Sequence, residues 1–309
     1  MNSTITLDSK IYIAGHNGMV GSACWRALIT KGYKNIIGFS SKELDLRDQR
    51  AVFNMIEREK PVAIIDAAAN VGGILANSNY PYEFLMDNML IQNNLVKAAH
   101  ELDIPKFIFL GSSCIYPKMA PQPLKEEYLL TGPLEETNQW YAIAKISGVK
   151  LIEALRNQYN RDYVSLMPTN LYGPGDNYDL ETSHVLPAML RKFHEAKESN
   201  HSDVVLWGTG SPKREFLHVD DLANAVVYTL ENKMEESLYN VGSEVEISIK
   251  KLAQLIQKIT EHEGEIIWDQ NKPDGTPRKL MDSSKLHRLG WNSRINLDYG
   301  VEKVYKSQF

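Results

Sequence analysis

Tyr141 and Lys145 are the residues of this chain whose types and spacing most directly suggest acid–base chemistry. They lie in a segment, residues 138–160, whose apolar spacing predicts a helix, and residues four apart share one face of a helix. The Lys145 ammonium is therefore expected beside the Tyr141 phenol. There it would lower a pKa that starts near ~10 and prepare the hydroxyl to exchange a proton with a substrate oxygen. The same pair also arises by chance, so it needs support from elsewhere in the chain.

Ser112 follows a predicted strand, residues 106–110, and could supply that support. Ligands bind at the carboxyl ends of the strands in parallel α/β sheets, so its hydroxyl could donate to the same substrate oxygen. Cys114 lies two residues further on. Taken alone, Cys114 is best interpreted as a buried, unreactive thiol, and so is Cys24 within a predicted helix of small residues.

A glycine-rich loop joins the first predicted strand to the first predicted helix. Gly15, Gly18 and Gly21 follow residues 10–14 and open a helix over residues 19–31. Glycines there permit a tight turn and a close approach of the backbone to a pyrophosphate, and the helix N-terminus favours its charge. This strand-turn-helix context predicts a dinucleotide site, with a purely structural turn as the alternative.

The end of the second predicted strand bears on the choice of cofactor. An Asp or Glu there binds a ribose 2'-hydroxyl and disfavours a 2'-phosphate, whereas this chain has no carboxylate before Glu43. The hydroxyls of Ser40 and Ser41, together with Lys42, favour NADP(H) over NAD(H). An ordinary loop is the alternative interpretation of the two serines.

Strand-length apolar runs alternate with helical patterns through the first half of the chain. The expected strands are residues 10–14, 35–39, 61–67, 106–110 and 162–167. The expected helices are residues 19–31, 47–59, 83–102 and 138–160. This alternation predicts an α/β fold with a doubly wound parallel sheet of the Rossmann type.

Beyond Thr169 the sequence changes to loops rich in Gly, Pro, Asp and Asn, separated by shorter elements. We therefore expect an NADP(H)-binding domain over residues 1–169 and a smaller C-terminal α/β substrate-binding domain over residues 170–309. An apolar helix at residues 220–230 is expected to pack back on the first domain. Residues 215–232 would then rejoin that domain and leave the second one discontinuous.

The composition is that of a folded soluble protein: 309 residues, 43% hydrophobic, 24% charged, with a net charge of -5. The negative charge argues against a nucleic-acid partner, because no excess of cations is available to neutralise phosphates. The longest apolar run, residues 61–69, contains Asp66 and is too short for a membrane helix, and residues 1–10 lack the features of a signal peptide. The cysteines and histidines show no metal-ligand spacing, so we expect no metal and a cytoplasmic location.

Longer motifs give the chain a resemblance to a known family. Its Gly-x-x-Gly-x-x-Gly and Tyr-x-x-x-Lys motifs are similar to those of extended short-chain dehydrogenases/reductases, and nearly the whole chain resembles the GDP-L-fucose synthase family. The motifs behind the second resemblance are Ala14-Gly-His-Asn-Gly-Met-Val-Gly-Ser22, Val71-Gly-Gly-Ile74, Leu110-Gly-Ser-Ser-Cys-Ile-Tyr-Pro-Lys118, Met167-Pro-Thr-Asn-Leu-Tyr-Gly-Pro174, Arg214-Glu-Phe-Leu-His-Val-Asp-Asp221 and Pro273-Asp-Gly-Thr-Pro-Arg-Lys279. The resemblance implies a bifunctional oxidoreductase and isomerase, a 3,5-epimerase and 4-reductase that converts GDP-4-keto-6-deoxy-D-mannose to GDP-L-fucose with NADPH. It also implies a homodimer packed through a helix bundle.

Epimerisation beside a ketone needs a base, a stabilised enolate and an acid on the opposite face of the sugar. The resemblance implies Cys114 as one of the two proton carriers. If residues 112–114 are extended, the Cys114 thiol lies beside the Ser112 hydroxyl, because alternate side chains of a strand point the same way. Lys145 or a cationic histidine could then lower the pKa of the thiol.

His184 is the second proton carrier that the resemblance implies. It precedes a predicted helix, residues 186–196, and an unperturbed pKa near ~6.5 would let its imidazole return a proton at neutral pH. A solvent-facing residue at the start of a helix is the alternative interpretation.

The resemblance also implies binding residues. For the cofactor they are Gly15, Asn17, Gly18, Met19, Val20, Gly21, Ser41, Lys42, Leu110, Gly111, Ser112, Lys145, Pro168, Thr169, Asn170, Leu171 and His184. For the GDP moiety they are Lys192, Trp207, Arg214 and Asp274. The cations would pair with the diphosphate and the indole would stack on guanine, while core packing is the alternative for Trp207.

Three positions depart from the family pattern. Asn17 and Ser41 stand where the family has arginines that would hold the 2'-phosphate, and Lys192 also replaces an arginine. A reductase or epimerase/reductase of a colitose or heptose precursor is therefore an alternative, as are a reductase without epimerisation, a 4-epimerase and a 4,6-dehydratase. A dehydratase would carry an Asp-Glu pair where Ser113-Cys114 stands. A sensor without turnover is the remaining alternative, and the complete set of Ser112, Tyr141 and Lys145 argues against it.

Overall fold

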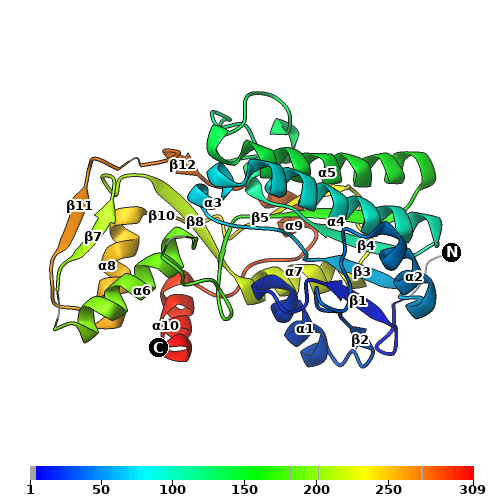
Figure 1. Ribbon diagram of the computed structural model, residues 1–309, viewed down its shortest axis with the longest axis horizontal. Helices are drawn as coiled ribbons and strands as arrows, with labels where there is room; N and C mark the ends of the chain where they lie inside the picture. Colours follow the sequence, from blue (N-terminus) through cyan, green and yellow to red (C-terminus); the bar gives the residue numbers. More distant parts are fainter. Residues whose placement is uncertain (1–4, 181, 201, 273) are drawn as a thin grey trace.

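The computed structural model describes residues 5–180, 182–200, 202–272 and 274–309. Within these residues, the largest sheet has six parallel strands in the order β2-β1-β3-β4-β5-β9 (Figure 1). Their bounds are β1 Ile11–Ala14, β2 Ile36–Ile37, β3 Ala63–Asp66, β4 Lys106–Leu110, β5 Asp162–Pro168 and β9 Leu238–Val241. The chain runs from β1 to β2 on one side and then crosses to β3 on the other, so the strand order reverses between β1 and β3. The predicted doubly wound sheet is confirmed, although β2 is shorter than the expected strand at residues 35–39.

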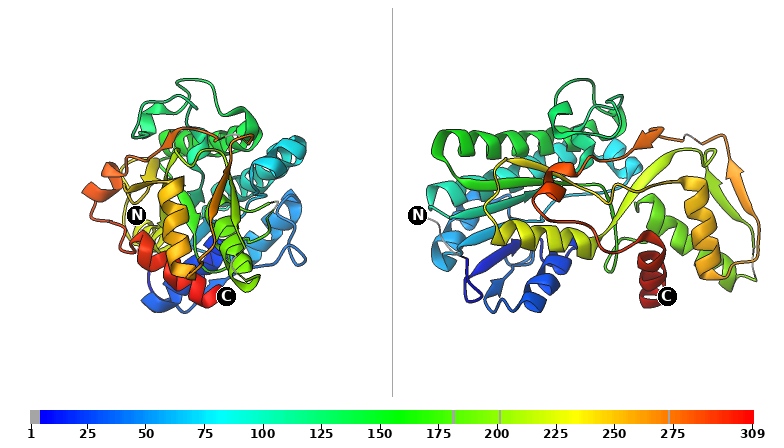
Figure 2. Two further views of the ribbon diagram at one scale, coloured as in Figure 1. Left: turned by 90° about the vertical axis from the view of Figure 1, so that its left-hand side faces the viewer. Right: turned by 180° about the vertical axis from the view of Figure 1, so that it is seen from behind.

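Helices cover both faces of this sheet, as Figures 1 and 2 show. One face is covered by α1 (Met19–Lys31) and α7 (Val219–Glu231), and the other by α2 (Gln49–Glu59), α4 (Pro81–Glu101) and α5 (Gln139–Tyr159). Ile11 and Ile13 pack toward α1 and α7, whereas Tyr12 and Ala14 pack toward the other layer. Because both faces are buried, the strands are mostly apolar, with Asp66 of β3, Lys106 of β4 and Ser165 of β5 among the exceptions.

The smaller part of the molecule is built from short strands and three helices. Its strands are β6 Asn170–Tyr172, β7 Val204–Trp207, β8 Lys213–His218, β10 Glu246–Ser248, β11 Ile266–Asp269 and β12 Arg278–Lys279. Its helices are α6 Val185–Glu198, α8 Ile249–Thr260 and α10 Leu297–Gln308. Leu190 and Phe193 of α6 meet Leu252 of α8 and Val301 of α10 in a separate apolar core.

The chain passes between the two parts several times. β5 ends at Pro168 and β6 begins at Asn170, so a single residue separates the large sheet from the small one. The chain returns to the large sheet through α7 and β9, and again through α9 (Ser284–Arg288), which packs on β9. The remaining short elements are α3 Ile74–Asn79, η1 Ser113–Ile115, η2 Glu126–Tyr128 and η3 Glu136–Asn138. In the part of the chain described, no helix has the length and hydropathy needed to cross a bilayer.

Candidate active site

The glycine-rich loop has the shape that a dinucleotide needs. Gly15 adopts a φ of +76°, and a Cβ on Gly21 would lie 2.1 Å from the Gly15 carbonyl oxygen. The first turn of α1 therefore sits directly on the loop, and only glycine fits at that contact. Gly18 begins α1 with no side-chain cap and no acidic residue in the first turn, so the backbone N–H groups of this turn and the helix dipole suit a phosphate. Asn17 and Gly18 are exposed, while Met19 and Val20 are half-buried.

At the end of β2, one of the two serine hydroxyls is already engaged. The Ser40 backbone N–H and hydroxyl donate to the Glu43 carboxylate at 2.8 and 2.7 Å, and these hydrogen bonds lower the pKa of Glu43. Ser41 and Lys42 are exposed. The expectation that both serines are available to a 2'-phosphate is therefore wrong for Ser40, because its hydroxyl closes a turn.

Lys145 and Tyr141 lie on one face of α5, as the spacing predicts. The Lys145 side chain is buried, and its ammonium donates to the Leu110 carbonyl oxygen at 2.9 Å and lies 5.8 Å from the centroid of the Tyr141 ring. Burial lowers the pKa of Lys145, and the charges of Asp66 and Cys114 oppose that effect. Burial raises the pKa of Tyr141 well above its ordinary value. The expected lowering of the Tyr141 pKa is therefore wrong for this structure, because burial raises this pKa and the charges of Cys114 and Asp66 act in the same direction.

Ser112 and Cys114 form a turn instead of an extended segment. Ser112 caps the short helix η1, and its hydroxyl oxygen accepts a hydrogen bond from the Cys114 backbone N–H at 3.4 Å. The expectation that residues 112–114 are extended is thus wrong, because the serine side chain captures the backbone of the turn. Cys114 is 7% exposed and borders a cavity that also touches Asn138 and Lys279. Burial raises the pKa of the thiol, and the Lys279 ammonium is the strongest influence in the opposite direction.

His184 is the residue that caps the N-terminus of α6, and its side chain is accessible to solvent. The protein around the imidazole still desolvates it and lowers its pKa, and the nearby Lys279 ammonium lowers it further. The glycines of the Val71-Gly-Gly motif position the loop that leads to this histidine. The Gly73 N–H donates to the Thr182 carbonyl oxygen at 3.0 Å, and a Cβ on Gly73 would lie 3.1 Å from the Ser183 carbonyl oxygen.

Lys279 is a candidate that the sequence reasoning missed. It lies on β12, where it pairs in register with Arg214 of β8, and its charge acts on both Cys114 and His184. The family motif at residues 273–279 ends at Lys279 and was a visible signal for this lysine. No local spacing, however, connects Lys279 to Cys114. Strand pairing in the small sheet brings it there.

The candidate GDP-binding residues gather in the small part of the molecule. Lys192 on α6 donates to the Val205 carbonyl oxygen at 2.9 Å, and Asp274 accepts hydrogen bonds from the Thr209 backbone and side chain at 2.7 and 2.8 Å. Trp207 is 61% exposed, which excludes core packing as the explanation for it. The Lys272 ammonium lies 5.2 Å from the centroid of the Trp207 ring, a contact that sequence reasoning did not find.

The remaining cofactor candidates line the carboxyl ends of β4 and β5. The Gly111 N–H donates to the Leu166 carbonyl oxygen at 2.9 Å, and the Thr169 N–H donates to the Val241 carbonyl oxygen at 3.0 Å. The Asn170 side chain donates to the Glu215 carbonyl oxygen at 2.7 Å, where the chain enters the small sheet. Leu110 and Pro168 are the last residues of β4 and β5, whereas Leu171 lies within β6 and pairs with Leu217 of β8. The predicted site residues thus come from the loops and strand ends at the carboxyl edge of the large sheet, from α5 and from the smaller part of the molecule.

Comparison with known proteins agrees with this arrangement. The profile of the NAD dependent epimerase/dehydratase family matches residues 11–242. The chain is 53% identical to GDP-L-fucose synthase 1 of Arabidopsis thaliana, over 96% of this chain and 92% of the relative. It is 50% identical to GDP-L-fucose synthase of Escherichia coli strain K12, over 96% of this chain and 95% of the relative.

Among solved structures, a GDP-mannoheptose C4 reductase from Campylobacter jejuni with NADP bound superposes with a TM-score of 0.90 at 36% identity. The match covers 98% of each chain. Both the sequence and the fold therefore lead to the same assignment, and this chain belongs to the NAD dependent epimerase/dehydratase family.

Proposed function

We propose that this enzyme converts GDP-4-keto-6-deoxy-D-mannose to GDP-L-fucose by epimerising C3 and C5 and then reducing C4, with NADP(H) as its cofactor. Near-full-length similarity to GDP-L-fucose synthases supports the substrate and the cofactor. The observation that best supports the proposal is that Cys114 interacts with Ser112, Tyr141 and Lys145, while Lys279 acts on both Cys114 and His184. Ser112, Tyr141 and Lys145 form an oxygen-binding set, and Cys114 and His184 form a pair of proton carriers.

In the reduction, the oxygen on C4 must gain a proton. Tyr141 donates that proton, and Ser112 holds the carbonyl by a hydrogen bond from its hydroxyl. The Lys145 ammonium stabilises the phenolate that the transfer leaves behind. When bound, NADPH supplies the hydride for C4.

In the epimerisation, Cys114 removes a proton beside the ketone and His184 returns one from the other face of the sugar. The resulting enolate has its negative charge on the C4 oxygen, so Ser112 and Tyr141 stabilise it as well. A buried thiol resists ionisation, and the Lys279 ammonium offsets that resistance. One oxyanion site therefore serves both reactions.

Binding divides between the two parts of the molecule. Residues 1–169, rejoined by residues 215–232, hold the cofactor, with the glycine-rich loop on its diphosphate. The rest of residues 170–309 binds the GDP moiety. Lys192 and Arg214 pair with the diphosphate and Trp207 stacks on guanine, as cations and exposed indoles do in such sites.

The proposal is tested by incubating the purified protein with GDP-4-keto-6-deoxy-D-mannose and NADPH in D₂O and identifying the product. We expect GDP-L-fucose labelled at C3 and C5. Cys114→Ser is expected to abolish labelling at C3 and C5 while NADPH still binds, and Tyr141→Phe is expected to slow NADPH oxidation by at least ~10²-fold. A reduced but unlabelled sugar would assign the protein as a simple C4 reductase instead.

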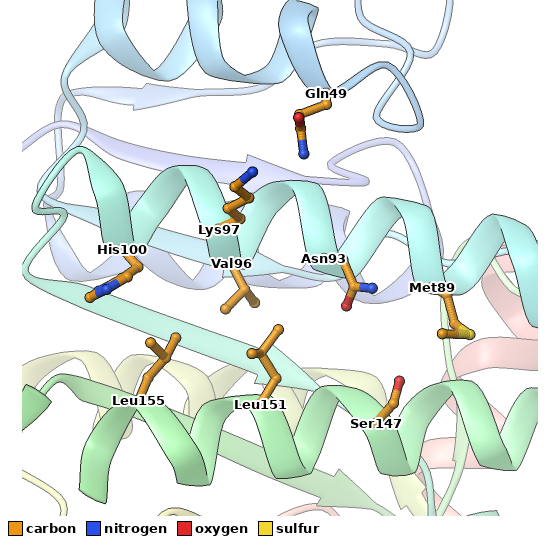
Figure 3. Close-up of a pocket in the computed structure, with 9 residues that line it drawn as sticks. All are labelled: Gln49, Met89, Asn93, Val96, Lys97, His100, Ser147, Leu151 and Leu155. Atoms are coloured by element: carbon orange, nitrogen blue, oxygen red, sulfur yellow. The ribbon is translucent and has the colours of Figure 1, made fainter. Parts of the chain in front are cut away.

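We also propose that the enzyme is a homodimer, with α4 and α5 of each subunit forming the interface. Tyr82, Met86 and Leu90 on α4, and Trp140 and Ile143 on α5, expose large apolar side chains. A hollow runs between the two helices beside α2 (Figure 3). Its lining residues are Gln49, Met89, Asn93, Val96, Lys97, His100, Ser147, Leu151 and Leu155.

Exposed apolar faces of this extent on two neighbouring long helices are typical of interaction surfaces. A second copy of the same helix pair would cover them in a four-helix bundle. We assign the enzyme to the cytoplasm, because Cys24 and Cys114 are both free thiols and reducing compartments preserve free thiols.

A further inference from the structure

Asp66 is a buried carboxylate that none of the steps above uses. It is the last residue of β3, is 0% exposed, and follows Ala63, Ile64 and Ile65. One carboxylate oxygen accepts a hydrogen bond from the Ala68 N–H at 3.2 Å. The other oxygen is buried and has no hydrogen-bond partner among the residues that the structure describes. An incompletely paired acid inside a doubly covered sheet is costly, so its position needs a physical reason.

The reason lies one strand away. Asp66 is the register partner of Phe109 on β4, and the Lys145 ammonium lies 4.6 Å from the centroid of the Phe109 ring. Register partners in a parallel sheet point their side chains to the same face. The Asp66 carboxylate and the Lys145 ammonium therefore share the layer between the sheet and α5.

Few ionisable groups face this layer. β1 contributes Tyr12, α5 contributes Tyr141 and Lys145, and η1 contributes Cys114, whose charge acts on both α5 residues. The buried polar side chains of α4, which are Asn88, Gln92 and Asn94, are uncharged. Of the groups that act on Asp66, Lys145 carries the positive charge.

We propose that Asp66 is a positioning residue for the reduction and acts as the counter-ion that keeps the buried Lys145 ammonium charged beside Tyr141. This inference rests on the proposed function, because it assigns Asp66 a part in the proton transfer to C4. It explains why an acid is tolerated in β3. It also explains how an ammonium whose hydrogen-bond acceptor is a neutral carbonyl can stay protonated in an apolar layer.

The pH dependence follows from the charges. Burial raises the pKa of Asp66 to about 6, so the counter-ion is charged at neutral pH. Below this value Lys145 holds its proton even without the counter-ion, because the solution is acidic, and the wild-type enzyme should therefore keep its reductase activity from neutral pH down to about pH 5. Burial alone lowers the pKa of Lys145, and Asp66 is the strongest opposing charge. Without Asp66, Lys145 should lose its proton at lower pH, so activity should instead fall as the pH rises.

The test compares Asp66→Asn with the wild type in kcat and KM for NADPH across pH 5–9. For the variant we expect kcat at neutral pH to fall by about tenfold and KM for NADPH to stay unchanged. This loss is smaller than the ~10²-fold effect of removing the general acid Tyr141, because the variant keeps the phenol. The variant should recover as the pH is lowered and approach the wild type near pH 5, where the wild-type Asp66 is neutral as well. Superimposable pH profiles for the two proteins would overturn the proposal.

Two further variants separate this role from packing. Asp66→Leu fills the site without charge and should show the same kinetic loss in a protein with an intact thermal transition. Tyr12→Phe removes another buried, unpartnered polar atom from the same layer and should leave the pH profile unchanged. If the wild type does not reduce the GDP-4-keto sugar, the proposed function fails. If the wild type reduces the sugar and Asp66→Asn shows the same kcat and pH profile, the proposed function stands and only the proposed role of Asp66 fails.

Discussion

At the scale of single residues, the Asp66 carboxylate connects the stability of the fold to pH. Its pKa is about 6 in the folded protein and near ~3.9 in the unfolded chain. The unfolded state therefore releases this proton first, and the contribution of Asp66 to stability is lost as the pH rises from about 4 through about 6. At neutral pH the cost is on the order of 2–3 kcal/mol.

Asp66→Asn is accordingly expected to be more thermostable than the wild type at pH 7, by several degrees in Tm, although it is the slower reductase. The gain should shrink as the pH approaches 4, where both side chains are neutral. Thermal unfolding followed by circular dichroism between pH 4.5 and 7.5 measures this. A difference in Tm that does not change with pH would contradict the assignment of the buried charge.

We expect Ser41 to influence how firmly the enzyme holds a 2'-phosphate. Its side chain is exposed beside Lys42, while the neighbouring Ser40 is engaged by Glu43. Ser41→Arg should lower KM for NADPH by about tenfold, the effect of ~1.4 kcal/mol, because a guanidinium pairs with phosphate through charged hydrogen bonds. KM for NADH should not change. Ser41→Gln, which adds length without charge, is the matched control and should leave both values as they are.

Whether such a residue can be recognised from the sequence depends on how the fold brings it to its partner. Tyr141 and Lys145 are one helical turn apart, so their spacing alone places them on one face. Lys279 reaches Cys114 through the pairing of β12 with β8, and Asp66 reaches Lys145 through the pairing of β3 with β4. Contacts of that kind depend on the tertiary fold, although the single acid in the apolar run at residues 61–69 was a visible signal for Asp66.

At the scale of elements, the contact between α1 and the glycine-rich loop is a tight constraint on the proposed cofactor site. A Cβ on Gly21 would lie 2.1 Å from the Gly15 carbonyl oxygen, whereas a Cβ on Gly18 would lie 3.4 Å from the same atom. Gly21→Ala should therefore push α1 away from the loop, destabilise the protein by about 1–3 kcal/mol and weaken NADPH binding.

Gly18→Ala is the matched control for folding, since its backbone conformation suits any residue and its added methyl group has room. Thermal unfolding and NADPH fluorescence titration separate the two effects. Equal Tm values for the two variants would show that the close approach at Gly21 does not constrain the fold.

Elements formed by local patterns were predictable, and elements formed by distant pairing were not. The predicted helix at residues 19–31 coincides with α1, because a glycine loop begins it and Gly32, at φ +95°, ends it. The missed strand β9 has only four residues and is specified by its place beside β5. β2 is shorter than expected, and a Cβ on Gly38 at its end would lie 2.4 Å from the His16 ring.

At the scale of the whole molecule, α4 and α5, which carry the exposed apolar side chains, lie in the layer opposite α1 and α7 (Figure 2). Leu90 on α4 is 37% exposed within that face, and Ile29 on α1 is 57% exposed on the other layer. A charge at Leu90 would be buried without a partner in the proposed four-helix interface, whereas a charge at Ile29 would remain in water. The two positions therefore make a matched pair for testing the homodimer.

We expect the wild type and Ile29→Glu to sediment at twice the chain mass of 35.1 kDa, and Leu90→Glu to sediment as a monomer. Thermal unfolding of Leu90→Glu should still be cooperative, because the substitution lies outside the apolar cores of the subunit. If Leu90→Glu is still a dimer, the interface must be formed by a surface other than the proposed face of α4 and α5. A monomeric wild type would contradict the proposed homodimer. It would not contradict the proposed activity, because all the proposed catalytic residues come from one chain.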